Sequence, residues 1–242
     1  MMAPEIRPTD AGYYVGVYGG ANFAQNYNTH TSIDPTATSF PSTGVFKQGG
    51  STSGDVGGVG GIKAGYNFES YTIDGEFKLQ PAVEAEALYL GAKAKTTFSY
   101  LGSPGSTITE SSTQDSGAFM VNGIIRLKTG TILTPYLGSG IGLEYTKLSR
   151  ATLTSATGNT NSGNNHVNAD NLSPAVQGLI GCDVEVFRNW DVFTEYKYLV
   201  AIDPQFSSVN FSNLAAGSPN SYTFKSDYLG QHLITAGVKY NF

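Results

Sequence analysis

The side chains that most often act as nucleophiles, bases or metal ligands are few here, with one cysteine and three histidines in the chain. Nucleophilic catalysis needs a nucleophile, a base and an orienting group within hydrogen-bonding reach of one another. His30 and His166 fall in polar segments, whereas His232 falls in a segment that alternates between apolar and polar residues. The candidate partners of His232 are scattered along the chain: Ser99, Ser139 and Glu195. No spacing links them to it, so we expect no catalytic residues.

Metal and cofactor sites are not indicated by the spacing of candidate ligands either. Cys182 is the single cysteine, which excludes an internal disulfide and a cysteine-based metal site, and its neighbours favour a packing or lipid-facing role. The run Gly138–Gly142 resembles a nucleotide-binding glycine motif, but no helical pattern follows it. Acidic residues in polar segments lack the regular spacing of a calcium loop: Asp34, Asp55, Asp115, Asp170 and Asp203. We expect neither a metal nor a cofactor.

Charge and composition argue against a nucleic-acid-binding protein and against a protein with membrane-spanning helices. The net charge is −5 and no run of Lys or Arg occurs, which argues against binding of nucleic acid. Charged residues make up 14% of the chain, against roughly 25% in soluble domains. The apolar residues are nevertheless spread out, in runs far shorter than the roughly 18 residues of a membrane helix. This pattern is typical of strands with one apolar and one polar face.

Eight segments alternate with the period of two that predicts β-strands. They span residues 13–27, 56–68, 80–100, 117–128, 133–148, 173–187, 190–200 and 224–242. The spacers are alternately long and short, as in a barrel whose two termini lie on the side of the short turns. The sequence therefore predicts an all-β fold, an eight-stranded antiparallel up-and-down transmembrane β-barrel with long extracellular loops and short periplasmic turns.

The two faces of these strands differ in charge. One face is nearly free of charged residues at membrane depth, and the other collects eleven: Lys63, Glu84, Glu86, Arg126, Glu144, Asp183, Glu185, Asp191, Glu195, Lys197 and Lys239. A soluble barrel shows the reverse arrangement, with apolar residues inside. We therefore predict an outer surface in contact with membrane lipid and a polar cluster in the barrel interior.

The interior of an eight-stranded barrel is narrow enough for side chains to fill. Because unpaired charges are costly there, we predict ion pairs between residues at similar heights: Lys63 with Glu84 and Glu86, and Lys239 with Asp183 and Asp191. Inward glycines leave room for bulky inward residues: Tyr14, Tyr18, Tyr136 and Phe193. We interpret the cluster as a polar core that plugs the lumen; the alternative is an ion path or gate.

Aromatic residues collect near both ends of the strands. Those on the side of the short turns are Tyr66, Phe68, Trp190, Tyr240 and Phe242, and those on the side of the loops are Phe23, Tyr89, Tyr145 and Tyr198. Amphipathic rings favour the headgroup level of a bilayer. We predict two aromatic girdles.

The C-terminal segment resembles the signal by which outer-membrane barrels are recognised by the insertion machinery, with Thr235, Gly237, Tyr240 and Phe242 at its defining positions. Three further segments resemble strands of the small OmpA/OmpX-like and opacity-protein-like barrel families: residues 13–20, 134–142 and 189–199. The resemblance implies location in the outer membrane of a Gram-negative-type cell and cleavage of a signal peptide. Since Met1–Glu5 has no signal-peptide pattern, we expect a mature form with an added initiator Met. Residues 1–11 are then a flexible segment and residues 12–242 a single barrel domain.

For function, we favour a non-enzymatic surface protein whose loops contact an external or host ligand, as in an adhesin or surface antigen. Two alternatives are a small pore and, less favoured, an enzyme that modifies lipid or peptide. Apolar loop residues either contact a ligand or fold back over the barrel mouth, and we favour the second: Ile33, Phe40, Val45, Phe46, Phe206, Val209, Phe211 and Leu214. The expected partners are membrane lipid, the insertion machinery and that external ligand.

Overall fold

A computed structural model describes most of the chain. The described residues are 11–25, 27–34, 46–54, 56–75, 77–99, 107–155, 160–161, 169–206, 221–226 and 228–242. The predicted N-terminal segment therefore lies almost entirely outside the described residues, as do Phe40, Val45, Val209, Phe211 and Leu214. No helix among the described residues is long and apolar enough to cross a membrane.

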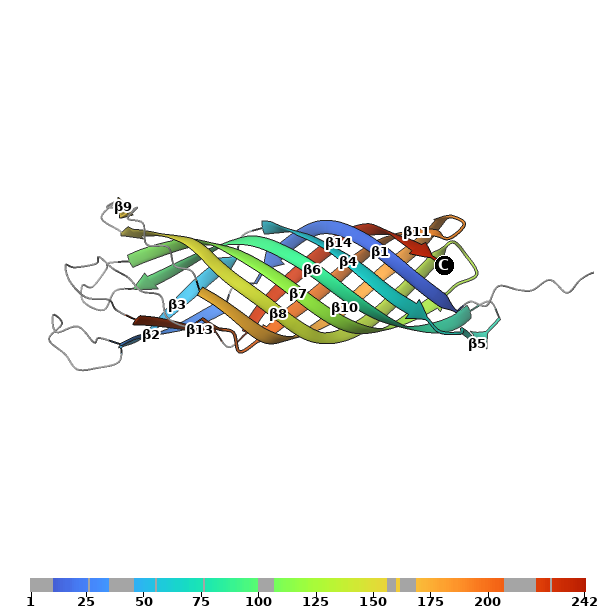
Figure 1. The fold of residues 1–242 in the computed structure, drawn as a ribbon, viewed down its shortest axis with the longest axis horizontal. Coiled ribbons are helices and arrows are strands. Elements are labelled where there is room, and N and C mark those ends of the chain that lie inside the picture. The colour runs from blue at the N-terminus through green and yellow to red at the C-terminus, as the bar shows by residue number, and fades with distance from the viewer. Residues whose placement is uncertain are drawn as a thin grey trace, which may run out of the picture.

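Eight strands form a closed antiparallel tube, and its long axis lies horizontally in Figure 1. In chain order they are β1 (Gly12–Ala24), β4 (Val56–Asn67), β6 (Phe77–Ser99), β7 (Thr107–Lys128), β8 (Leu133–Ser155), β10 (Ala169–Phe187), β11 (Trp190–Ile202) and β14 (Tyr228–Asn241). Each strand pairs with the next, and β14 closes the tube on β1, with Tyr14 opposite Asn241 and Ala24 opposite Gln231. Closure leaves no unpaired edge in the ring of eight strands. This is required in the hydrocarbon core of a membrane, because no water is present there to hydrogen-bond exposed backbone groups. The predicted fold is confirmed.

The short turns gather at one end of the tube, together with the C-terminus (Figure 1), and this end is called the turn end below. The short strand β5 (Tyr71–Asp74) pairs with β6 there. The turns at this end use left-handed backbone at Gly75 (φ 51°), Gly130 (φ 72°) and Asn189 (φ 71°), residue types that accept this conformation. Tight turns of this kind need few residues, which explains the short spacers.

The opposite end, called the loop end, contains more strand than the sequence predicts. Five short strands lie there: β2 (Tyr27–Asp34), β3 (Phe46–Gly54), β9 (Thr160–Asn161), β12 (Gln205–Phe206) and β13 (Ser221–Ser226). In addition, β7 begins at Thr107 rather than Gly117, and β8 continues to Ser155 rather than ending at Leu148. The expectation of long loops over these residues is wrong. Thr gives them β-propensity, but their sequence shows no regular apolar alternation by which strands are recognised.

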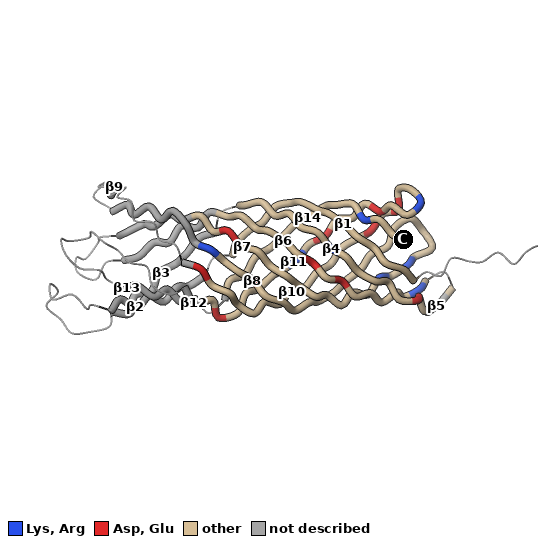
Figure 2. Tube along the Cα trace, in the orientation of Figure 1, with Lys and Arg blue, Asp and Glu red and all other residues tan. Residues whose placement is uncertain are grey.

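Side chains alternate between exposed and buried along the strands of the tube. Apolar residues on the outer face are widely exposed, for example Val17 at 53%, Ile62 at 63% and Ile141 at 71%. Charged residues are sparse along the middle of the tube and more frequent at the turn end (Figure 2). An apolar outer surface of this extent is stable only in contact with lipid or another apolar phase.

One residue assigned to the interior departs from the prediction. Glu185 is exposed, although Asp183 on the same strand is 4% exposed and points inward. The register between β10 and β11 shifts between Glu185 and Phe187, where the strand leaves the tube for the Arg188–Asn189 turn. At this end the side chain reaches water, so alternation no longer places it in the lumen.

Candidate functional site: the polar interior of the barrel

Nine of the eleven charged side chains predicted to face inward are buried in the interior of the barrel. Each is at most 4% exposed: Lys63, Glu84, Glu86, Arg126, Glu144, Asp183, Glu195, Lys197 and Lys239. They come from seven strands and divide into three groups along the axis. Eight of them form ion pairs, and Glu144 is the exception among the described residues.

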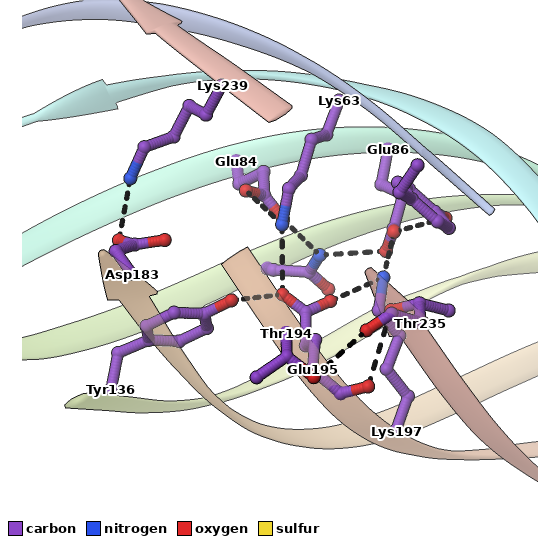
Figure 3. Close-up of polar contacts among 12 residues, drawn as sticks. Lys63, Glu84, Glu86, Tyr136, Asp183, Thr194, Glu195, Lys197, Thr235 and Lys239 are labelled. Atoms are coloured by element: carbon purple, nitrogen blue, oxygen red, sulfur yellow. Dashed lines mark hydrogen bonds and ion pairs between the residues drawn. The ribbon is translucent and has the colours of Figure 1, made fainter. Parts of the chain in front are cut away.

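The central cluster consists of Lys63, Glu84, Glu86, Glu195 and Lys197. Lys63 Nζ lies 2.9 Å from Glu195 Oε2 and 3.6 Å from Glu84 Oε2. Lys197 Nζ lies 2.8 Å from Glu195 Oε1 and also pairs with Glu86. Figure 3 shows the two lysines converging on Glu195 from different strands. Three carboxylates and two lysines give this cluster a net charge of −1.

Tyrosine hydroxyls complete the coordination of these carboxylates. Tyr14 donates to Glu84 Oε2 at 2.9 Å, Tyr18 to Glu86 Oε1 at 2.5 Å and Tyr136 to Glu195 Oε2 at 2.7 Å. The sequence predicted that these tyrosines are bulky residues facing the interior, but it did not predict their hydrogen bonds. The charged residues on the inward faces of nearby strands could have predicted these hydrogen bonds, because a buried hydroxyl group usually has a hydrogen-bond partner.

Two amides link the same cluster to strands β7 and β10. Asn122 donates to Glu84 at 3.2 Å and to Glu86 at 3.3 Å. Gln177 donates to Glu86 at 3.0 Å and to the side-chain oxygen of Asn122 at 2.6 Å. Sequence reasoning placed both residues on the polar face without assigning them a role. Together the bonds cross-link strands on different sides of the lumen.

The turn-end cluster consists of Arg126, Asp183, Asp191 and Lys239, and it is neutral. Lys239 Nζ lies 2.6 Å from Asp183 and 3.1 Å from Asp191, as predicted. Arg126 Nε lies 3.7 Å from Asp183. The Arg126 guanidinium carbon also lies 5.0 Å from the Tyr14 ring centroid, within the range of a cation–π contact.

The interior glycines make this filling possible. A Cβ atom on Gly61 would overlap the Tyr18 ring, one on Gly65 would overlap the Tyr14 ring, and one on Gly181 would overlap the Tyr136 ring. Each tyrosine ring therefore lies over a neighbouring strand that carries no side chain at that point, and its hydroxyl reaches a carboxylate on the strand beyond. The glycines are required for packing, which is the usual reason for glycine within a strand.

The loop-end cluster consists of Asn22, Ser116, Glu144, Thr146 and Gln231. Gln231 Nε2 donates to Glu144 Oε1 at 2.8 Å, and Asn22 Nδ2 donates to Gln231 Oε1 at 2.9 Å. The Thr146 hydroxyl lies 3.3 Å from Glu144 Oε1 and 3.0 Å from the Ser116 hydroxyl. All its members are at most 3% exposed. This cluster is hydrogen-bonded but contains no cation among its described partners.

His232 lies on the outer face and is separated from the interior acids by the barrel wall. It pairs with Tyr198 across β11 in regular register, so no bulge turns it inward. Its Nδ1 lies 2.7 Å from the Tyr196 hydroxyl, and its ring centroid lies 4.8 Å from that of Tyr198. Glu195, which points inward, is therefore not its partner. The described ranges also contain no group of three side chains able to hold a metal ion.

Aromatic rings of the turn-end girdle form edge-to-face contacts on the outer surface. The ring centroids of Tyr66 and Phe68 lie 5.2 Å apart, and Tyr240 lies 5.0 Å from both Trp190 and Phe242. Two further members of the C-terminal motif lie on the same strand: Thr235, 1% exposed, and Gly237. Placement at the headgroup level remains a prediction for both girdles.

A closed eight-stranded sheet with an apolar outside and an ionic inside defines the class: this is a β-barrel protein of the bacterial outer membrane. The outer membrane protein OprG from Pseudomonas aeruginosa has a similar fold, with 13% identity, 96% of each chain covered and a TM-score of 0.50. Neisserial surface protein A is 17% identical, with 96% of this chain and 99% of that chain covered and a TM-score of 0.35. The outer membrane protease OmpT from Escherichia coli is 8% identical, with 99% and 100% covered and a TM-score of 0.44.

At such identities the likeness to OprG extends to the fold alone, and the lower TM-scores of the other two carry no argument. The chain matches no protein-family model, and no curated protein matches it either.

Proposed function

We propose that this protein is a non-enzymatic surface protein whose strands and loops at the loop end bind molecules outside the cell, as an adhesin or surface antigen does. The observation that carries the proposal is the length of β6, β7 and β8, which run for 23, 22 and 23 residues. A tilted strand crosses a bilayer in about 9–11 residues. About half of each strand is therefore available outside the membrane.

The composition of these strand ends supports the proposal. Beyond Tyr89 and Tyr145 on the outer face, the strands carry mainly Lys, Thr, Ser and Glu. Paired backbone continues there, from Gly91 opposite Asp115 to Ser99 opposite Thr107. A hydrogen-bonded platform with polar side chains is a rigid base on which loops can present a binding surface.

A shortened hairpin between β6 and β7 tests the proposal. Lys95 and Ser111 face each other across the two strands, so residues 96–110 can be replaced by Asn-Gly, a two-residue turn suited to antiparallel strands. The matched control carries Asn-Gly in place of Arg188–Asn189, at the turn end. Folding of both variants is checked by heat-modifiable migration in gels and by their abundance in the outer membrane.

Binding is measured with whole cells that express each variant, on immobilised extracellular-matrix proteins and on cultured epithelial cells. The intact protein and the turn-end control are expected to bind above cells without the protein, whereas the shortened variant folds but binds at that background level. If the intact protein does not exceed the background, or if the shortened variant binds equally well, the proposal is wrong.

We also propose that Thr235, Gly237, Tyr240 and Phe242 are recognised by the barrel-insertion machinery before folding. The support is the resemblance of all four positions to the known signal. Deleting Phe242 is expected to lower the amount inserted in cells, while the purified variant still refolds in detergent. Equal insertion of both forms in cells would contradict this role.

A further inference from the structure

Glu144 differs from the other carboxylates buried in the lumen. Glu84, Glu86, Asp183 and Glu195 each have a Lys or Arg nitrogen within 3.7 Å. Glu144 is 0% exposed, yet its hydrogen-bond donors are neutral: the Gln231 amide at 2.8 Å, the Thr146 hydroxyl at 3.3 Å and the Ser116 hydroxyl. Among the residues that the structure describes, no cation pairs with it. Burial of an isolated ionised carboxylate is strongly unfavourable.

Two buried oxygen atoms in the loop-end cluster also lack a hydrogen-bond donor from the protein: Glu144 Oε2 and Asn22 Oδ1. Asn22, like Glu144, is 0% exposed. Gln231 cannot serve either oxygen further, because its Oε1 accepts from Asn22 and its Nε2 donates to Glu144 Oε1. More than about 90% of buried polar groups in proteins have partners. The two acceptors at the ends of this hydrogen-bonded chain are therefore open to a donor or a cation from outside the protein.

The ligand atoms of the loop-end cluster define the chemistry of that group. They are oxygens of a carboxylate, an amide and two hydroxyls, and they carry one formal negative charge. Hard oxygen ligands favour alkali and alkaline-earth cations over transition metals. Calcium takes 6–8 oxygens and usually several carboxylates, whereas the described residues contain no group of three acidic, His or Cys side chains suited to a metal. A single charge matches a monovalent cation.

The electrostatic field inside the lumen also favours a bound cation. The central cluster, whose Glu86 and Glu195 share the lysine Lys197, carries one more carboxylate than it has lysines. Its net negative charge attracts a cation and repels an anion in the same low-dielectric lumen. We propose that the loop-end cluster binds one small monovalent cation, an alkali ion or a primary ammonium group, with Glu144 as the charged ligand and Asn22 as a neutral one.

Unfolding of the purified full-length barrel in detergent micelles tests this proposal. Choline chloride is replaced stepwise, at constant ionic strength, by sodium, potassium or methylammonium chloride. A cation that binds only the folded state raises the urea midpoint as its concentration rises. The wild type is expected to show this rise with at least one small cation, and Glu144→Gln is expected to lose it. The inorganic and methylammonium arms separate an alkali ion from an amine.

Glu185→Gln serves as the control, because Glu185 is an exposed carboxylate and its loss should leave the cation response unchanged. If Glu144→Gln fails to refold, Asn22→Ala is measured in its place, and broadening of the sodium-23 NMR line by the folded wild type gives a direct measure. An equal midpoint in all salts together with no sodium broadening would overturn the proposal. So would an infrared band of a protonated carboxyl group that disappears in Glu144→Gln, since a proton would then neutralise the site.

Discussion

Lys63 and Glu195 are 132 residues apart in the sequence, yet their Nζ and Oε2 atoms lie 2.9 Å apart inside the barrel. Lys63 comes from β4 and Glu195 from β11, strands that are not neighbours in the closed sheet. The pair therefore bridges the lumen instead of joining adjacent strands. Each side chain is at most 2% exposed, so the contact is removed from water. A bridge of this kind both fills the interior and ties two parts of the wall together.

The charge balance of the central cluster predicts unequal effects of removing the two partners. Lys63→Met leaves three carboxylates with Lys197 alone and is expected to destabilise the barrel by about 3–5 kcal/mol. Glu195→Gln leaves two carboxylates with two lysines and should cost less, about 1.5–3 kcal/mol for the lost charged hydrogen bonds. Urea unfolding in lipid vesicles measures both free energies.

The double variant Lys63→Met, Glu195→Gln provides the control for this asymmetry. Because it removes one charge of each sign, it should be more stable than Lys63→Met alone. Strictly additive losses, or equal losses for the two single variants, would show that charge balance does not govern the cluster.

Gly237 is predicted to be irreplaceable for steric reasons. A Cβ atom there would meet the carbonyl oxygen of Val17, the Cβ of Tyr18 and the ring of Phe193. Gly237→Ala should therefore destabilise the barrel by about 1–3 kcal/mol, the usual cost of overpacking. Gly178 is the matched control, because it is exposed and a Cβ atom there meets nothing within 4 Å. Gly178→Ala should change the urea midpoint little, and a loss as large as that of Gly237→Ala would contradict the steric explanation.

The alternation of the sequence was sufficient to predict which side of the wall most residues face. Period-two patterning assigns a face without knowledge of any neighbour, and Tyr14, Lys63 and Arg126 lie inside as it indicated. Pairs at similar heights, such as Lys239 with Asp183, followed from the short turns that fix the register. These features depend only on local pattern and turn length.

Contacts across the lumen were beyond the reach of that reasoning. Lys197 pairs with Glu86 on a distant strand, and this depends on the tilt and stagger of the closed barrel. The strand ends at the loop end, such as Thr107–Ser116, were also missed as strands. The sequence of this segment lacks regular apolar alternation, so its pairing with β6 and β8 decides the structure.

The filled interior predicts that the purified protein does not conduct. Large side chains occupy the lumen with at most 6% exposure, among them Tyr18, Phe193 and Lys197. In planar bilayers the wild type should give no steady openings of a single size, whereas Tyr18→Ala, Phe193→Ala, Lys197→Ala should give them. The matched triple variant replaces exposed outward residues by Ala at Val17, Ile62 and Ile234 and should stay closed. Steady single-sized openings of the wild type would favour a pore instead.

The turn-end girdle can be located in the membrane through Trp190, the single tryptophan of the chain. Trp190 is 44% exposed on the outer surface and contacts Tyr240 at a centroid distance of 5.0 Å. An indole at headgroup level lies near the glycerol end of the acyl chains. In vesicles, lipids brominated near that end should therefore quench its fluorescence more strongly than lipids brominated near the terminal methyl. The variant Trp190→Phe fixes the tyrosine background. Stronger quenching by the deep bromines would contradict the predicted girdle, because it would place Trp190 within the hydrocarbon core. The membrane boundary at the turn end would then lie closer to the Arg188–Asn189 turn.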